Sequence, residues 1–138
     1  MPDTPRRGLV DTSVIIALRH IELSSLPEEL AVSAVSLAEL AAGPHATLDT
    51  VEGARRQARL QYAETSLDAL PFDSAAARAY GQIYAAVVAS GRKARGRRSS
   101  DLLIAATALA ADLPLYTRNP NDFSGLEDLV TVIGIPEA

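Results

Sequence analysis

Four acidic residues stand where a strand is predicted to end or a helix to begin, and side chains at such places can bind metal ions. They are Asp11, Glu39, Asp101 and Asp122. In open α/β sheets, ligands bind beyond the carboxyl ends of the strands, so we expect these acids at one edge of the sheet. Carboxylates gathered in a partly dry cleft repel one another by several kcal/mol unless some are protonated or a cation lies between them.

A divalent cation would remove this repulsion, and the ligand type indicates which one. Carboxylate oxygens select a hard cation. Mg²⁺ keeps several waters and binds through few carboxylates together with a substrate phosphate, so it suits an open site. The acids therefore predict a Mg²⁺ site, in which Mn²⁺ can substitute.

Each acid also has a structural explanation that needs no metal. Asp11 fits a helix N-cap, because its side chain can accept hydrogen bonds from first-turn amides. Glu39 lies three residues after Ser36, which is the spacing of a capping box. The helix dipole favours Asp101 in a first turn, and Asp122 fits a turn. These explanations leave open why all four acids are expected at one edge.

A basic stretch precedes Asp101 in a chain whose net charge is −4. This acidic balance argues weakly against a nucleic-acid partner, because phosphate binding requires positive charge. Such a stretch is usually a solvated loop. Beside a carboxylate–metal site it can instead hold a nucleic-acid backbone with little base specificity, and Arg118 can add a phosphate contact. The basic stretch consists of Arg92, Lys93, Arg95, Arg97 and Arg98.

The composition excludes several kinds of chemistry. The chain has no cysteine, which excludes disulfides, Cys-ligated zinc, iron–sulfur clusters and thiol nucleophiles and favours a reducing cytoplasm. No apolar stretch reaches membrane-spanning length, so we expect a soluble, unprocessed protein without a membrane partner. Neither His20 nor His45 occupies a predicted strand end, which argues against histidine chemistry of the cyclic-phosphate kind. We expect residues 1–138 to form a single domain, because this length suffices for one core.

Strands and helices are predicted to alternate along the chain. This alternation indicates an α/β fold, a three-layer sandwich with a central, mostly parallel sheet and helices on both faces. Strands are expected at residues 9–10, 31–35, just before Pro71, 115–117 and 129–133. Helices are expected at residues 14–18, from the Ser36 cap to Gly43, at 47–65, from Asp73 or Ser74 to 89, and from Ser99 to 111. Two helix faces are expected to be apolar, the first with Leu48, Val51, Ala54, Ala58 and Tyr62, the second with Ala77, Tyr80, Ile83, Tyr84 and Val87 turned inward.

Four blocks of the sequence, in this order, resemble the PIN-domain VapC toxins of bacterial and archaeal toxin–antitoxin pairs. They are VDTSVIIAL, SLAELAAG, SSDLLIAATALAADLPLYTRNPNDF and a final short strand, and together they cover nearly the whole chain. The resemblance implies a PIN-like fold. It also implies that Asp11, Glu39, Asp101 and Asp122 occupy the family's catalytic, metal-binding positions.

The fourth of these positions is open between two residues. Some PIN domains carry an acid directly after the Thr-Arg pair, where this chain has Asn119. The fourth site residue is therefore either Asp122 or Asn119, whose amide can orient a metal-bound water. The polar neighbours of the acids are expected to be accessory residues, namely Thr12, Ser13, Thr117 and Asn119.

The resemblance also implies an activity and partners. The chain would be a Mg²⁺-dependent endoribonuclease that cuts structured RNA such as tRNA or ribosomal RNA and that a cognate VapB-type antitoxin keeps inactive. In-line hydrolysis would leave a 5′-phosphate and a 3′-hydroxyl. Apolar positions on the Ala-rich helices exceed what one core needs, which suits a homodimer and an antitoxin-binding groove.

Three other interpretations compete with this one. Receiver domains also combine acids at strand ends with a metal, but they need a lysine after a late strand, and Lys93 lies in the basic stretch. A catalytically silent PIN fold would act only as a binding partner, although this chain retains the acids. A structure-specific DNA nuclease would use the same chemistry.

Overall fold

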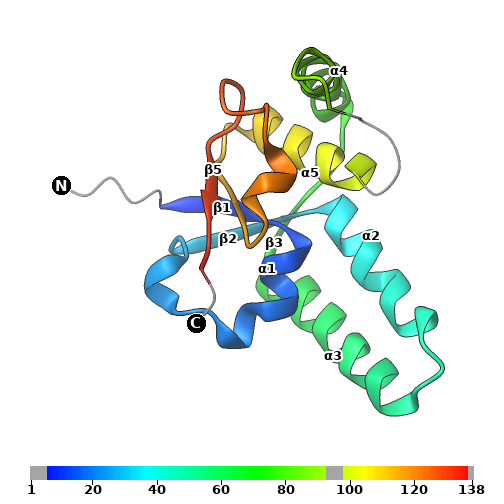
Figure 1. Ribbon diagram of the computed structural model, residues 1–138. Helices are drawn as coiled ribbons and strands as arrows, with labels where there is room; N and C mark the ends of the chain where they lie inside the picture. The colour runs from blue at the N-terminus through cyan, green and yellow to red at the C-terminus, as the bar shows by residue number, and fades with distance from the viewer. Residues whose placement is uncertain (1–5, 93–97, 137–138) are drawn as a thin grey trace.

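The computed structural model describes residues 6–92 and 98–136 of the chain. Its centre is a five-stranded sheet in the order β3-β2-β1-β4-β5, in which every neighbouring pair of strands is parallel (Figure 1). The predicted α/β sandwich around a parallel sheet is thus confirmed. The strands are β1 (Arg7–Val10), β2 (Glu29–Ser33), β3 (Asp68–Leu70), β4 (Leu115–Thr117) and β5 (Val132–Gly134).

Five α-helices connect and cover the described strands. They are α1 (Thr12–Ala17), α2 (Ala34–Ala42), α3 (Thr50–Ser66), α4 (Ser74–Ala89) and α5 (Arg98–Ala111). Short 3₁₀ helices occur at Leu18–His20, Leu23–Ser25, Gly43–Ala46 and Pro120–Phe123. Within residues 6–92 and 98–136, no helix is long and apolar enough to cross a membrane.

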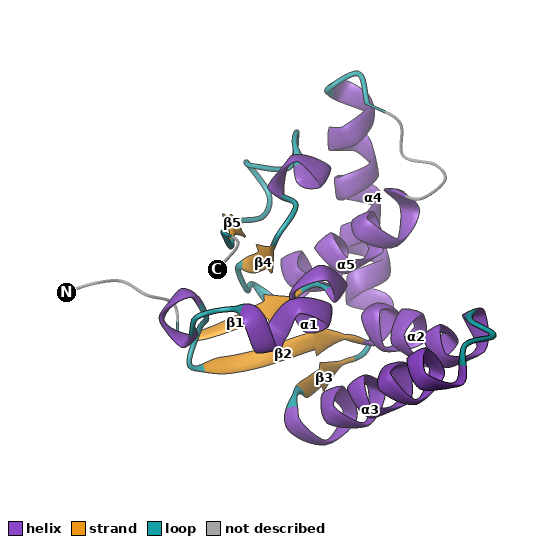
Figure 2. Ribbon diagram, turned by 60° about the horizontal axis from the view of Figure 1, so that its bottom comes forward, coloured by secondary structure: helices purple, strands orange, loops and turns teal. Residues whose placement is uncertain are grey.

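Alternating side chains of the strands build two cores, one on each face of the sheet. Leu9 and Leu115 pack with α4 and α5 on one face. Val10 and Tyr116, the next residues along the same strands, pack with α1 and α3 on the other. Figure 2 shows α4 and α3 on opposite sides of the strands. Because helices cover both faces, polar side chains can gather at the carboxyl ends of the strands rather than on the faces of the sheet.

A glycine permits the close packing of β4 on β1. A Cβ atom at Gly8 would collide with the ring of Tyr116, which is 3% exposed. Burial also raises the pKa of the Tyr116 phenol. The absence of a side chain at Gly8 therefore lets the tyrosine ring lie against the first strand.

The first turn of α2 begins earlier than the sequence predicted. Ser33, not Ser36, is the N-cap, and its hydroxyl accepts a hydrogen bond from the amide of Val35 at 3.1 Å. Val35, a β-branched residue expected in the strand, is the second residue of the helix. The prediction that Ser36 caps this helix is therefore wrong, and Ser36 is a buried helical residue.

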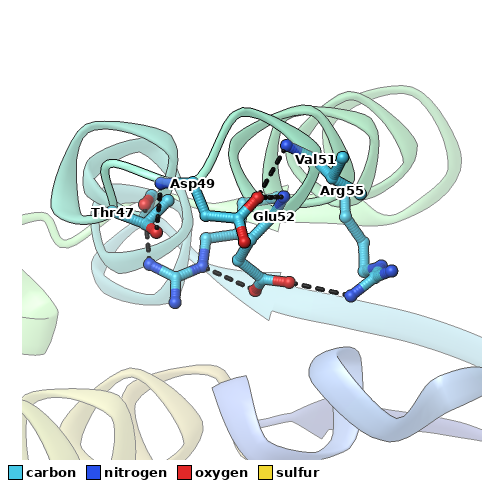
Figure 3. Close-up of polar contacts among 7 residues, drawn as sticks. Thr47, Asp49, Val51, Glu52 and Arg55 are labelled. Atoms are coloured by element: carbon cyan, nitrogen blue, oxygen red, sulfur yellow. Dashed lines mark hydrogen bonds and ion pairs between the residues drawn. The ribbon is translucent and has the colours of Figure 1, made fainter.

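The long helix α3 begins at Thr50 rather than at Thr47, because Asp49 is its N-cap (Figure 3). The Asp49 carboxylate accepts hydrogen bonds from the amides of Val51 at 2.9 Å and Glu52 at 3.1 Å. Thr47 lies outside the helix, where its hydroxyl accepts a hydrogen bond from the amide of Asp49 at 3.2 Å. A carboxylate that accepts two first-turn amides is the stronger start signal.

An arginine on α3 ties this helix to the end of α2. Arg56 donates one hydrogen bond to the carbonyl of Gly43 at 2.9 Å and another to the carboxylate of Glu52 at 2.8 Å. Glu52 also accepts from Arg55 at 2.9 Å. The hydrogen bond from Arg56 is the main reason why the pKa of Glu52 is lowered. This network holds the turn between α2 and α3.

The predicted apolar faces of α3 and α4 are only partly correct. Val51 and Tyr62 of α3 are 66% and 48% exposed, and α3 packs mainly against α2 and the 3₁₀ helix Gly43–Ala46. On α4, Ile83 and Val87 are buried as predicted. Ala77 and Tyr84 are exposed, so their predicted inward position is wrong. Leu48, Ala54 and Ala58, predicted near one apolar face, are also exposed.

Candidate active site

Asp11 occupies the carboxyl end of β1 and caps α1. Its carboxylate accepts hydrogen bonds from the Ser13 hydroxyl at 2.6 Å and from the amide of Val14 at 3.1 Å. The residue is 5% exposed. Burial raises the pKa of its carboxyl, and hydrogen bonds from Ser13 and Thr117 oppose that rise. Asp11 is thus both the predicted N-cap and a buried acid at a strand end.

Glu39 joins the starts of two other helices. Its carboxylate accepts a hydrogen bond from the Thr12 hydroxyl at 2.6 Å and another from the Ser100 hydroxyl at 3.3 Å. The capping box with Ser36 is not formed, since α2 already begins at Ala34. Ser36 and Glu39 are three residues apart on α2, so both point toward α1, where Thr12 Oγ1 lies 3.0 Å from Ser36 Oγ.

The first turn of α5 reaches this group through Ser100. Asp101 is partly buried in that turn, one residue after the serine that contacts Glu39. On the other side of Glu39, Thr12 directly follows Asp11. The fold therefore brings together three segments that are far apart in the sequence, each of which carries one of the predicted acids.

The turn after β4 is attached to the same edge. The backbone amide of Arg118 donates a hydrogen bond to the Ser13 hydroxyl at 3.1 Å, and the amide of Asn119 donates one to Thr117 Oγ1 at 3.0 Å. Thr117 is fully buried. Asp122 lies in the Pro120–Phe123 turn and is partly buried, whereas the side chain of Asn119 is exposed. The choice between these two as the fourth site residue stays open.

The acids predicted to hold one or two ions do not form an enclosed cluster in the described residues. Within the described part of the chain, no three Asp, Glu or His side chains lie close enough to hold a metal ion. Asp11 and Glu39 are each turned toward hydroxyl groups, which satisfy two carboxylates that would repel each other at short range. Mg²⁺ often uses only one or two carboxylates and keeps several waters. These oxygen donors therefore fit a hydrated hard ion rather than an enclosed one, and their assignment as metal ligands stays a prediction.

The comparisons decide the family. The PIN domain family model matches residues 8–128. The chain belongs to the PIN-domain family. Over 135 residues it is 36% identical to "Ribonuclease VapC5" of Mycobacterium tuberculosis, with 96% of each chain covered. It is also 30% identical over 133 residues to "Ribonuclease VapC" of Rickettsia bellii, with 93% of this chain and 96% of that protein covered.

A solved structure supports the same assignment. The PIN domain superposes with a TM-score of 0.81 on the VapBC-5 structure from Mycobacterium tuberculosis, described as a member of the VapBC family of toxin–antitoxin systems. That similarity covers 96% of this chain and 99% of the other at 36% identity. The resemblance to VapC proteins predicted from the sequence blocks is thus confirmed.

The basic stretch of this PIN domain is only partly described. Arg92 donates a hydrogen bond from its guanidinium to the carbonyl of Asn121 at 3.0 Å. This contact attaches the segment that follows α4 to the turn that carries Asp122. Lys93, Arg95 and Arg97 lie outside the described residues, and the side chain of Arg98, the first residue of α5, is not described either.

Neither histidine of the PIN domain lies at the strand ends. His20 and His45 are exposed residues of short 3₁₀ helices. The prediction that neither occupies a strand end is confirmed.

Sequence reasoning missed two hydroxyl groups beside the acids. Ser100 was assigned only to a helix start and Ser36 only to a cap, yet Ser100 contacts Glu39 and Ser36 contacts Thr12. The spacing of these serines relative to the acids could have indicated them. Ser36 lies one helical turn before Glu39, and Ser100 directly precedes Asp101.

Proposed function

We propose that this PIN domain is a Mg²⁺-dependent endoribonuclease toxin of a VapBC-type pair. One observation carries the proposal: Glu39 contacts both the residue after Asp11 and the residue before Asp101, at the carboxyl ends of the strands. The similarity to two proteins named as ribonucleases supports RNA as the substrate.

Asp11, Glu39 and Asp101 are the residues that would hold the metal, with Asp122 or Asn119 completing the site. The bound ion, Mg²⁺ or in its place Mn²⁺, would supply a nucleophilic water and neutralise charge on the scissile phosphate. Ser13 orients the Asp11 carboxylate, and Thr12 and Ser100 orient that of Glu39. The buried position of Asp11 keeps bulk water from one side of the site.

The basic stretch from Arg92 to Arg98 would hold the RNA backbone, with Arg118 as a further phosphate contact. The hydrogen bond from Arg92 to the Asn121 carbonyl supports this placement, because it attaches the start of the stretch to the turn that carries Asp122. Structured RNA of the tRNA or ribosomal RNA class is the expected substrate. Cleavage would leave a 5′-phosphate and a 3′-hydroxyl.

A VapB-type antitoxin is the proposed inhibitor, and the toxin is proposed to form a homodimer in the cytoplasm. The similarity to a chain from a toxin–antitoxin structure supports the first of these partners. Helices α3 and α4 carry exposed apolar side chains that a partner protein can bury. They include Val51, Tyr62, Tyr84 and Val88.

Sequencing of RNA ends after induced expression tests activity and substrate together. The wild type should create new 5′-phosphate ends at defined positions of structured RNA, and the Asp101→Asn variant, made to equal levels, should create none. Identical end profiles for both proteins would contradict the proposal. Purified protein incubated with RNA and with DNA separates the remaining alternatives, since a silent PIN fold cuts neither and a DNA nuclease cuts only the second.

A further inference from the structure

Two buried hydroxyl groups join the end of β2 to the middle of α5. Ser33 Oγ and Thr107 Oγ1 lie 3.0 Å apart. Ser33 is 0% and Thr107 2% exposed. Their surroundings on α5 are apolar, and Ala105, Ala106 and Ala108 are all buried there. Burial of polar groups in such a core costs free energy of folding unless each group makes its hydrogen bonds.

The direction of each hydrogen bond in this pair follows from the neighbours. Thr107 Oγ1 donates to the carbonyl of Leu103 at 3.0 Å, so its only proton is used. Ser33 must therefore donate to Thr107, while Ser33 Oγ accepts from the amide of Val35. The Ser33 hydroxyl thus performs two tasks, since it caps α2 and holds α5.

The same two helices meet again at the candidate active site. Ser100 precedes Thr107 by about two helical turns, so both lie on one face of α5. Ser100 contacts Glu39, which lies on the helix that Ser33 caps. Helices α2 and α5 are therefore joined at two places, in the core by Ser33 and Thr107 and at the candidate active site by Glu39 and Ser100.

We propose that Ser33 and Thr107 are positioning residues, which set the register of α5 against α2 so that Ser100 and Asp101 face Glu39. Apolar side chains of the same size would fill the space but would let α5 slide or rotate, because they impose no direction. The expected change in kcat rests on the proposed nuclease function. The expected effect on the placement of α5 does not.

The test uses a double variant, a hydroxyl-preserving swap and a stability control. Ser33→Ala with Thr107→Val removes both hydroxyls, whereas Ser33→Thr with Thr107→Ser exchanges them. Leu26→Ala, in the core on the opposite face of the sheet, supplies a comparable loss of Tm away from α5. For each protein, kcat and KM on RNA are measured together with hydrogen exchange at the amides of Leu102 and Leu103.

In the double variant, kcat should fall on the order of 10- to 100-fold with little change in KM, and the two amides should exchange faster. The swap and Leu26→Ala should keep kcat and exchange near wild type. Wild-type exchange and kcat in the double variant would overturn the proposal, as would an equal loss of kcat in Leu26→Ala. A wild type that cuts no RNA would overturn the proposed function alone, because the exchange measurement would still decide the positioning role.

Discussion

The Thr12 hydroxyl lies 2.6 Å from the carboxylate of Glu39. This contact joins the first residue of α1 to the middle of α2, and Ser36 Oγ lies 3.0 Å from the same hydroxyl. The position of Glu39 is therefore set by the neighbour of Asp11. Two acids that are distant in the sequence are coupled through one side chain.

Replacement of Thr12 by Val should remove this coupling without changing the size of the side chain. We expect kcat to fall about 10- to 100-fold, as is typical when a group that orients a metal ligand is lost. Thr12→Ser, which keeps the hydroxyl, is the control and should retain most of the activity. Equal activity in Thr12→Val and wild type, measured on the same RNA, would show that the contact has no catalytic role.

Replacement of Asp11 by Asn should raise Tm at pH 7 while it abolishes cleavage. Burial raises the pKa of this carboxyl above its ordinary value of 3.8, so its charged form is less favourable in the folded than in the unfolded chain. The stabilising contribution of the group is complete below pH 3.8 and is lost as pH rises through the folded pKa. The advantage of Asp11→Asn should therefore shrink as the pH of the unfolding experiment is lowered.

The control for this pH series is Asp49→Asn, which changes an exposed N-cap on α3. It should give no comparable rise in Tm at pH 7. A lower Tm for Asp11→Asn than for wild type across the whole pH range would contradict the conclusion that burial makes the charged form of Asp11 unfavourable in the folded chain.

Replacement of Gly8 by Ala should destabilise the fold through the Tyr116 ring. The new methyl group would overlap the ring, which has to move within a packed core. Such overpacking costs about 1–3 kcal/mol in the free energy of unfolding, measured with urea. Gly81→Ala on α4 is the matched control, since a Cβ there meets nothing within 4 Å, and it should stabilise by about 0.4–1 kcal/mol. An equal effect of the two substitutions would refute the packing argument.

Replacement of Arg97 and Arg98 by Gln should weaken RNA binding and flatten its dependence on salt. Each lost phosphate contact is expected to lower the slope of log K against log salt by about 0.7–0.9. RNA binding is measured with proteins that also carry Asp101→Asn, so that the RNA is not cleaved during the measurement. Arg19→Gln, an exposed arginine on a different element, serves as the control. An unchanged slope would remove the basic stretch from the RNA site.

The sequence predicted a parallel sheet and the segments that carry the site residues, because both depend on strong local signals. Alternating strands and helices imply a parallel sheet, and Asp11 at a strand end is placed by that topology. The start of α2 was missed by three residues, since Val35 has a side chain typical of strands but lies after the true cap at Ser33. The outward position of Val51 and Tyr62 could not be predicted, because it depends on how α3 packs against α2 and the 3₁₀ helix Gly43–Ala46.

The geometry of the acids was the least predictable part of the site. The meeting of the segments that carry the acids follows from topology, but the direction of the Asp11 and Glu39 carboxylates depends on hydroxyl donors such as Ser13, Thr12 and Ser100. Ser100 reaches Glu39 across 61 residues of sequence, and Arg118 reaches Ser13 across 105. No local pattern encodes such pairs.

Cleavage of purified RNA with Mg²⁺ and with excess chelator, by the wild type, Glu39→Gln and Asp101→Asn, tests the central claim most directly. The wild type should cut RNA only when Mg²⁺ is present, Mn²⁺ should restore cleavage after chelation, and both variants should be folded and inactive. Undiminished cleavage by the wild type in chelator, or full activity in both variants, would contradict a metal-dependent site built on these carboxylates.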